Sequence, residues 1–121
     1  MSKRILVIED QEDNRKIVRD LLTSVGYEVI EAFTGNDGVA LAAAEVPDLI
    51  LMDIQLPGID GYEVTRQIKA KPALNHIPII AVTSYALSGE ENKALEAGCD
   101  AYFAKPYSPR ELLAKIREYV P

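Results

Sequence analysis

The chain has 121 residues, of which 48% are hydrophobic, and a formal net charge of -6. This length suits one domain with its own buried core, so we expect residues 1–121 to form a single domain without an output domain. The acidic balance argues against nucleic-acid binding, which requires clustered Lys and Arg. No apolar run is long enough for a membrane helix or a signal peptide, and we therefore expect a cytoplasmic protein without membrane contact.

Short apolar runs alternate along the chain with segments of helical period. The runs predict strands near residues 4–8, 28–32, 48–53, 78–83 and 101–104. The predicted N-caps of the second to fifth helices are Thr34, Asp60, Ser88 and Ser108. This alternation is typical of βα units on a parallel sheet, which places the chain in the α/β class.

The first and fourth helices are expected to differ in how firmly they pack. The first is predicted over residues 13–25, with one apolar face made of Ile17, Leu21, Leu22 and Val25. The fourth, at about 88–97, offers little beyond Leu87, Leu95 and alanines to anchor it. Few large apolar contacts favour local opening, so this helix is either a moving part or simply a thin, solvated helix.

Polar side chains stand at the carboxyl ends of four predicted strands. They are Glu9 and Asp10 after the first run, Asp53 at the end of the third, Thr83 at the end of the fourth, and Lys105 after the fifth. Open α/β sheets bind ligands in a crevice outside these strand ends. The sequence therefore predicts that these side chains share one site.

Three carboxylates in one crevice repel one another unless a cation joins them. Mg²⁺ suits this set because it needs only one or two carboxylates and also accepts phosphate oxygens. Asp53 is then a candidate nucleophile that forms an aspartyl phosphate, with Lys105 and Thr83 contacting the phosphoryl oxygens. Each residue alone has an ordinary alternative, such as a helix cap or a solvated turn, but their combination in this order is specific.

Four segments carry a recognisable combination of motifs, namely RILVIED, LMDIQLPGIDGYEV, IPIIAVTSYA and AYFAKPYSPREL. Through them the chain resembles, over essentially its whole length, the receiver domain of bacterial response regulators, the phosphoacceptor module of two-component signalling. The resemblance implies a flavodoxin-like (βα)5 three-layer sandwich, with a parallel sheet of order 2-1-3-4-5 and helices on both faces. Among stand-alone receivers, the chain is similar to the DivK-like regulators of cell division.

The resemblance also implies roles for individual residues. Asp53 would be the phosphorylation site, Asp10 a direct Mg²⁺ ligand, and Glu9 a support for the metal, often through water. The main-chain carbonyl of Gln55 would supply a further metal oxygen, and Lys105 would contact the phosphoryl group.

Further implied roles concern the switch. Thr83 would be the switch hydroxyl, and Tyr102 the switch aromatic that turns inward, although an edge-strand aromatic that simply packs is the alternative. Pro106 would follow a cis peptide bond. Ser84 stands where alanine is more usual, a change that we expect phosphorylation to survive, and Tyr85 lies where the family varies.

The resemblance implies an output through another protein. Phosphorylation would shift a two-state population and change the surface of the fourth helix, fifth strand and fifth helix. The expected patch there comprises Leu87, Tyr102, Tyr107 and Leu113, with core packing as the alternative for the leucines. Expected partners are a histidine kinase or histidine phosphotransfer protein and a downstream target, with the chain a monomer or a weak phosphorylation-dependent dimer.

Two other functional classes fit the sequence less well. A Mg²⁺-dependent aspartyl phosphatase typically has an Asp-x-Asp pair after the first strand, whereas this strand ends in Glu9 and Asp10. A flavodoxin-like electron carrier needs a Ser, Thr and Gly loop where this chain has EDQED. His76 is expected at the surface, away from the crevice, and the single cysteine, Cys99, in a small buried apolar role.

Overall fold

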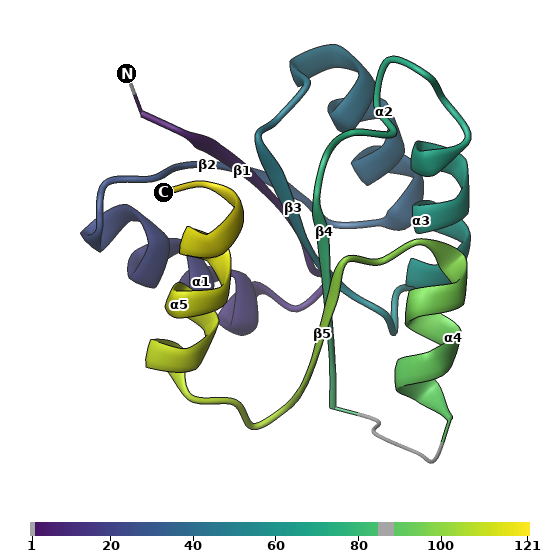
Figure 1. The fold of residues 1–121 in the computed structure, drawn as a ribbon. Coiled ribbons are helices and arrows are strands. Elements are labelled where there is room, and N and C mark those ends of the chain that lie inside the picture. The colour runs from purple at the N-terminus through teal and green to yellow at the C-terminus, as the bar shows by residue number, and fades with distance from the viewer. Residues whose placement is uncertain (1, 85–88) are drawn as a thin grey trace.

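The structure is a computed structural model that describes residues 2–84 and 89–121 (Figure 1). Within these ranges, strands and helices alternate as β1 Arg4–Ile8, α1 Glu12–Ser24, β2 Glu28–Ala32, α2 Gly35–Glu45, β3 Leu49–Asp53, α3 Gly61–Lys69, β4 Ile79–Thr83, α4 Glu90–Ala97, β5 Ala101–Ala104 and α5 Pro109–Tyr119. The predicted alternation is confirmed, and β3 and β4 each begin one residue later than expected. No helix within these ranges has the length and apolar character needed to cross a membrane.

The five strands form one parallel sheet in the order β2-β1-β3-β4-β5, as the resemblance implied. Helices α1 and α5 cover one face, and α2, α3 and α4 cover the other, which gives three layers (Figure 1). Because side chains alternate along a strand, neighbours such as Ile50 and Leu51 enter different cores. A sheet covered on both faces needs strands that are apolar throughout, and all five positions of β3 and of β4 are buried.

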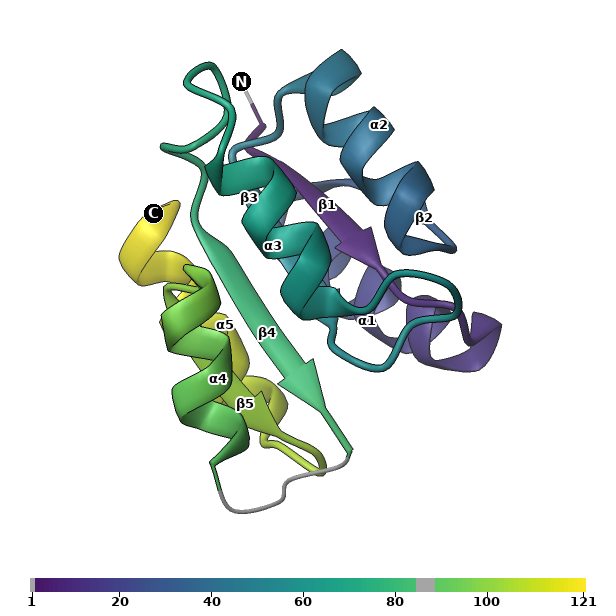
Figure 2. The same cartoon turned by 90° about the vertical axis from the view of Figure 1, so that its right-hand side faces the viewer.

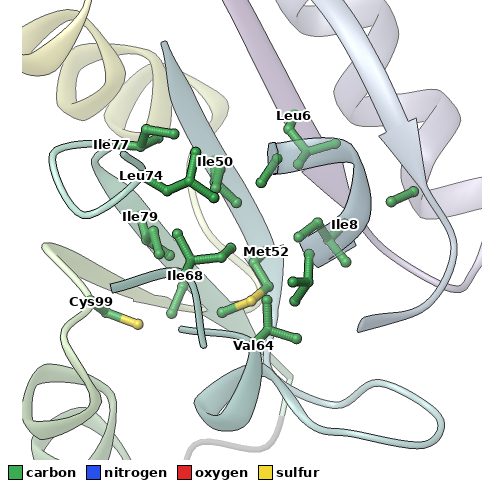
Figure 3. Close-up of a cluster of buried hydrophobic side chains, with 14 of the residues drawn as sticks. Leu6, Ile8, Ile50, Met52, Val64, Ile68, Leu74, Ile77, Ile79 and Cys99 are labelled. Atoms are coloured by element: carbon green, nitrogen blue, oxygen red, sulfur yellow. The ribbon is translucent and has the colours of Figure 1, made fainter. Parts of the chain in front are cut away.

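The core on the α2–α3–α4 side gathers buried residues from four strands and from the covering helices. Figure 3 shows Leu6, Ile8, Ile50 and Met52 from the sheet facing Val64 and Ile68 of α3. Cys99 belongs to this core at 5% exposure, and its Sγ lies 3.4 Å from the hydroxyl of Thr65. The predicted buried role of Cys99 is confirmed.

The predicted buried face of α1 was partly wrong. Leu22 is buried, but Ile17 is 65% exposed and Val25 is 39% exposed. The residues that α1 buries are Arg15, Val18 and Leu22, spaced by three and four. Ile17 is one position, or about 100° of helix rotation, from the centre of that stripe, and Val25 lies beyond the last turn.

Three of the four predicted helix caps are confirmed. The side chains of Thr34, Asp60 and Ser108 each accept a hydrogen bond from the main-chain N–H three positions later. The fourth predicted cap, Ser88, lies outside the described residues, and the described helix begins at Glu90 after Gly89.

Helix α4 is weakly anchored, as its sequence predicted. Ala94 is its buried residue, whereas Leu95, expected as an anchor, is 46% exposed. Leu87 lies outside the described residues. A side-chain contact ties the helix to α3, since the Tyr62 hydroxyl donates a hydrogen bond to the Glu90 carboxylate.

Candidate functional site

The strand ends converge where the polar residues stand. In Figure 2 the arrowheads of β1, β4 and β5 point to the same end of the sheet. Glu9 and Asp10 follow β1, and Asp53 is the last residue of β3, the neighbouring strand. Their carboxylate oxygens lie within 4.8 Å of one another, so the predicted acidic cluster is present.

Lys105 reaches the cluster from the end of β5. Its Nζ lies 3.1 Å from Glu9 Oε1 and 3.3 Å from Asp53 Oδ2, and both carboxylates are buried. Burial alone would lower the pKa of Lys105, but the Asp53 charge and the hydrogen bond and charge of Glu9 raise it above its ordinary value. The lysine is therefore a fixed positive charge beside the two carboxylates.

Main-chain amides orient the same carboxylates. The N–H of Gln55 donates to Asp53 Oδ1 at 2.9 Å, and the N–H of Gln11 donates to Glu9 Oε2 at 3.1 Å. Asp10 is the most solvent-accessible of the three carboxylates. Partial desolvation first, and then the hydrogen bond and charge of Glu9, raise the pKa of Asp10. A cation bound between these three carboxylates would reduce their mutual repulsion.

A cavity of about 420 Å³ opens beside the acidic cluster. Asp53, Ser84 and Lys105 line its polar end, and Ile17, Pro106 and Tyr107 contribute to its apolar wall. The Ser84 hydroxyl donates to Gln55 Oε1 at 3.2 Å, and the Lys105–Pro106 peptide bond is cis, as the resemblance implied. The exposed Ile17 thus borders the approach to Asp53.

The two switch candidates lie on adjacent strands. Thr83 ends β4 at 1% exposure, and its main-chain carbonyl accepts a hydrogen bond from the Lys105 N–H at 2.7 Å. Tyr102 of β5 is half-buried against the core on the α2–α3–α4 side, and burial raises its pKa. Tyr85 lies outside the described residues.

The members of the expected aromatic patch do not share one core. Tyr102 packs on the α2–α3–α4 side, whereas Tyr107 and Leu113 pack against the core on the α1–α5 side. The Tyr107 ring stands edge-on to Phe103 with centroids 6.2 Å apart. Tyr102 therefore packs on one face of the sheet, and Tyr107 and Leu113 pack on the other. Leu87 lies outside the described residues.

His76 and Arg15 lie at opposite ends of the sheet. His76 is exposed in the segment before β4, at the end of the sheet away from the acidic cluster, as expected. Arg15 of α1, which sequence reasoning did not single out, is buried and donates to the main-chain carbonyls of Glu9 and Asp10. A single arginine in a helix carries no sequence signal for such a role, because most helical arginines are solvated.

Comparisons with known proteins agree with this architecture. Residues 5–117 match the family model of the response regulator receiver domain. The polar-differentiation response regulator DivK of Brucella ovis is 44% identical, with 99% of this chain and 98% of the relative covered. The same identity and coverage hold for DivK of Brucella melitensis.

Solved structures show the same fold. The receiver domain of a sensor histidine kinase from Pseudomonas aeruginosa, which has a magnesium ion coordinated in its active-site cleft, superposes with a TM-score of 0.92 at 37% identity, covering 99% of this chain and 98% of that one. A CheY-like receiver domain protein from Methanospirillum hungatei superposes with a TM-score of 0.88 at 38% identity, covering 98% and 93%.

The chain therefore belongs to the response regulator receiver domain family. It is a phosphoacceptor response regulator of two-component signalling, and its DivK relatives match it over nearly their whole length. As a receiver domain it interacts with histidine kinases or with downstream targets of such systems. Its acidic cluster has the composition of a metal-ion site. This membership decides against the phosphatase and electron-carrier alternatives.

Proposed function

We propose that Asp53 accepts the phosphoryl group, with Mg²⁺ held by the carboxylates of Glu9, Asp10 and Asp53 and by the main-chain carbonyl of Gln55. The observation that carries the proposal is the convergence of three carboxylates within 4.8 Å, with Lys105 paired to two of them. The phosphoryl donor is the phosphohistidine of a histidine kinase or of a histidine phosphotransfer protein.

The donor set fits a small hard cation. Carboxylate and carbonyl oxygens suit Mg²⁺, which keeps several waters and bridges to phosphate oxygens. Partial desolvation first, and then the hydrogen bond and charge of Glu9, raise the pKa of Asp10; a cation beside this carboxylate would favour its ionised form, which supports the fit. When bound, Mg²⁺ supplies electrostatic stabilisation of the phosphoryl oxygens.

Group transfer requires little from the protein beyond positioning. A carboxylate oxygen of Asp53 attacks phosphorus, an oxygen–phosphorus bond forms, and the phosphorus–nitrogen bond to the donor imidazole breaks as that ring takes up a proton. Lys105, already 3.3 Å from Asp53, neutralises one phosphoryl oxygen. The Thr83 hydroxyl donates to another.

The output follows from a shift in population. The phosphorylated state draws Thr83 toward the phosphoryl group, and Tyr102 turns inward, which changes the surface of α4, β5 and α5. The weak anchoring of α4 supports this surface as the part that changes. The chain acts on a separate downstream protein as a monomer or weak phosphorylation-dependent dimer, and it assists its own phosphorylation without turning over another substrate.

The test is the intact mass of the protein after incubation with Mg²⁺ and acetyl phosphate, compared with Asp53→Asn and with an EDTA control. We expect a metal-dependent gain of one phosphoryl group that is absent from Asp53→Asn, while its circular dichroism is unchanged. Asp13→Asn, an exposed change in the first turn of α1, is the matched control and should label normally.

Retained labelling of Asp53→Asn at another residue would contradict the assignment. Absence of labelling in the wild type, with both acetyl phosphate and a phosphorylated histidine kinase as donors, would contradict phosphotransfer to this site altogether.

A further inference from the structure

Arg15 contacts the main chain of the turn that carries Glu9 and Asp10, two of the three carboxylates. It is 8% exposed, although it sits in the second turn of a surface helix. Its Nη1 donates to the main-chain carbonyl of Glu9 at 2.9 Å and to that of Asp10 at 3.1 Å. One guanidinium nitrogen therefore joins two of the three residues between β1 and α1.

The guanidinium itself is held in one orientation. Its Cζ lies 3.9 Å from the centroid of the Phe33 ring, which covers one face. Nε lies 3.5 Å from Oε1 of Glu31, on the neighbouring strand β2. Burying an arginine charge is costly, and these contacts offset part of that cost, while the buried Nε itself makes no hydrogen bond.

The contacts of Arg15 stabilise a turn that has no side-chain cap of its own. Gln11, at the N-cap of α1, makes no side-chain capping hydrogen bond, so the helix start is not fixed in the way that Thr34 fixes α2. Arg15 instead reaches back from inside the helix to the carbonyls that precede the N-cap. The direction of the Glu9 and Asp10 side chains depends on the backbone that these carbonyls belong to.

We propose that Arg15 is a positioning residue for the metal site, which holds the main chain of Glu9 and Asp10 so that their carboxylates face the cation site in the metal-free protein. The inference rests on the proposed function, because it concerns the affinity of the same site for Mg²⁺. Residues that orient metal ligands typically change metal affinity about 10- to 100-fold when they are replaced.

Removal of Arg15 changes Mg²⁺ affinity in opposite directions, depending on whether its charge or its positioning role dominates. Loss of a positive charge near a cation site, taken alone, strengthens Mg²⁺ binding. Loss of the anchor weakens it, because the carboxylates must be ordered during binding. The sign of the change in affinity therefore separates the two effects.

The experiment is a calorimetric titration of the metal-free protein with MgCl₂. Arg15→Met keeps the buried aliphatic volume but removes the guanidinium, and we expect Mg²⁺ affinity to fall about 10-fold. Arg19→Met is the matched control, because Arg19 also pairs with Glu31, at 3.0 Å, but does not contact the turn. It removes the same charge and should leave Mg²⁺ affinity unchanged or slightly higher.

An NMR comparison and a milder substitution distinguish a change at the turn from a general loss of folding. Amide NMR shifts of Glu9, Asp10 and Gln11 in the metal-free protein should change in Arg15→Met and not in Arg19→Met. Arg15→Lys retains the charge but loses the planar group, and it should weaken Mg²⁺ binding less than Arg15→Met. If Arg15→Met does not fold, weaker binding by Arg15→Lys supports the proposal and wild-type binding overturns it.

The remaining outcomes are distinct. Wild-type protein that binds Mg²⁺, with Arg15→Met binding equally or more tightly, would overturn the positioning role and leave the proposed function standing. Wild-type protein that binds no Mg²⁺ would overturn the proposed function and this inference with it.

Discussion

Lys105 holds together two carboxylates that would otherwise repel each other. It lies 96 positions from Glu9 in the chain, and its ammonium contacts both Glu9 and Asp53. A buried charge that loses its partner is costly, so the three groups depend on one another. In the proposed phosphotransfer the same ammonium meets a phosphoryl oxygen, so Lys105 would serve both the stability and the chemistry of the site.

Replacement of this lysine should therefore lower stability when no metal is present. We expect Lys105→Gln in EDTA to lose about 2 kcal/mol of unfolding free energy, less than for a fully buried pair because Lys105 is partly exposed. Added Mg²⁺ should recover much of the loss, since a cation again separates the carboxylates.

Urea unfolding with and without Mg²⁺ measures this effect. Lys115→Gln is the control, because Lys115 pairs with Glu118 on the surface of α5 at 3.3 Å, and such a pair contributes less than about 1 kcal/mol. Equal losses for the two variants would show that the Lys105 pairs contribute no more than a surface ion pair.

Individual elements differ in how firmly they join the sheet. Helix α3 buries Val64, Thr65 and Ile68, whereas α4 buries Ala94 alone among its described residues. The hydrogen bond from Tyr62 of α3 to Glu90 therefore adds a polar tie at the start of α4. An element held by few contacts opens at low free energy.

Loss of that hydrogen bond should loosen α4 selectively. In Tyr62→Phe we expect amide hydrogen exchange over residues 90–97 to become roughly 10-fold faster, which corresponds to about 1.4 kcal/mol. Exchange in β1 and β3 should be unaffected.

Tyr27→Phe is the matched control for this measurement. It also removes a hydroxyl hydrogen bond, from Tyr27 to the Val120 carbonyl at 2.7 Å, but on the other side of the sheet. Unchanged exchange in α4 of Tyr62→Phe, or equal acceleration in both variants, would rule out a specific tie between α3 and α4.

At the scale of the whole molecule, one sheet divides two hydrophobic cores that share its strands. Ile50 and Leu51 are adjacent in β3, with 0% and 2% exposure, and belong to different cores. Because β3 is central in the sheet, each core is coupled to the other through its backbone. The domain should therefore unfold as one cooperative unit.

This arrangement predicts that substitutions in either core, on either face of the sheet, lower the unfolding free energy by similar amounts. Ile50→Ala and Leu51→Ala should each lower the unfolding free energy by about 2 to 5 kcal/mol, with a single transition in both variants. Leu95→Ala, at an exposed position, should cost well under 1 kcal/mol. Far-UV circular dichroism and tyrosine fluorescence should give coincident urea curves; separate transitions would mean that the cores unfold independently.

The sequence was informative wherever the signal is local. Strands, caps such as Thr34 and Asp60, and the polar residues at strand ends could be predicted, because periodicity and capping depend on neighbours within a few positions. The buried face of α1 was predicted incorrectly at Ile17, because apolar side chains within a helix do not reveal which of them the sheet covers.

By itself the sequence determined the βα alternation and which polar residues stand at the ends of four strands, since these features depend on short-range patterns. The tertiary structure alone decided that Lys105 contacts two carboxylates, that Arg15 is buried beneath the Glu9–Asp10 turn, and that Tyr102 and Tyr107 pack on different sides of the sheet. These contacts join residues that are distant in sequence or hidden by neighbouring elements. They form only when the order of the strands brings those elements together, and no local pattern encodes that order.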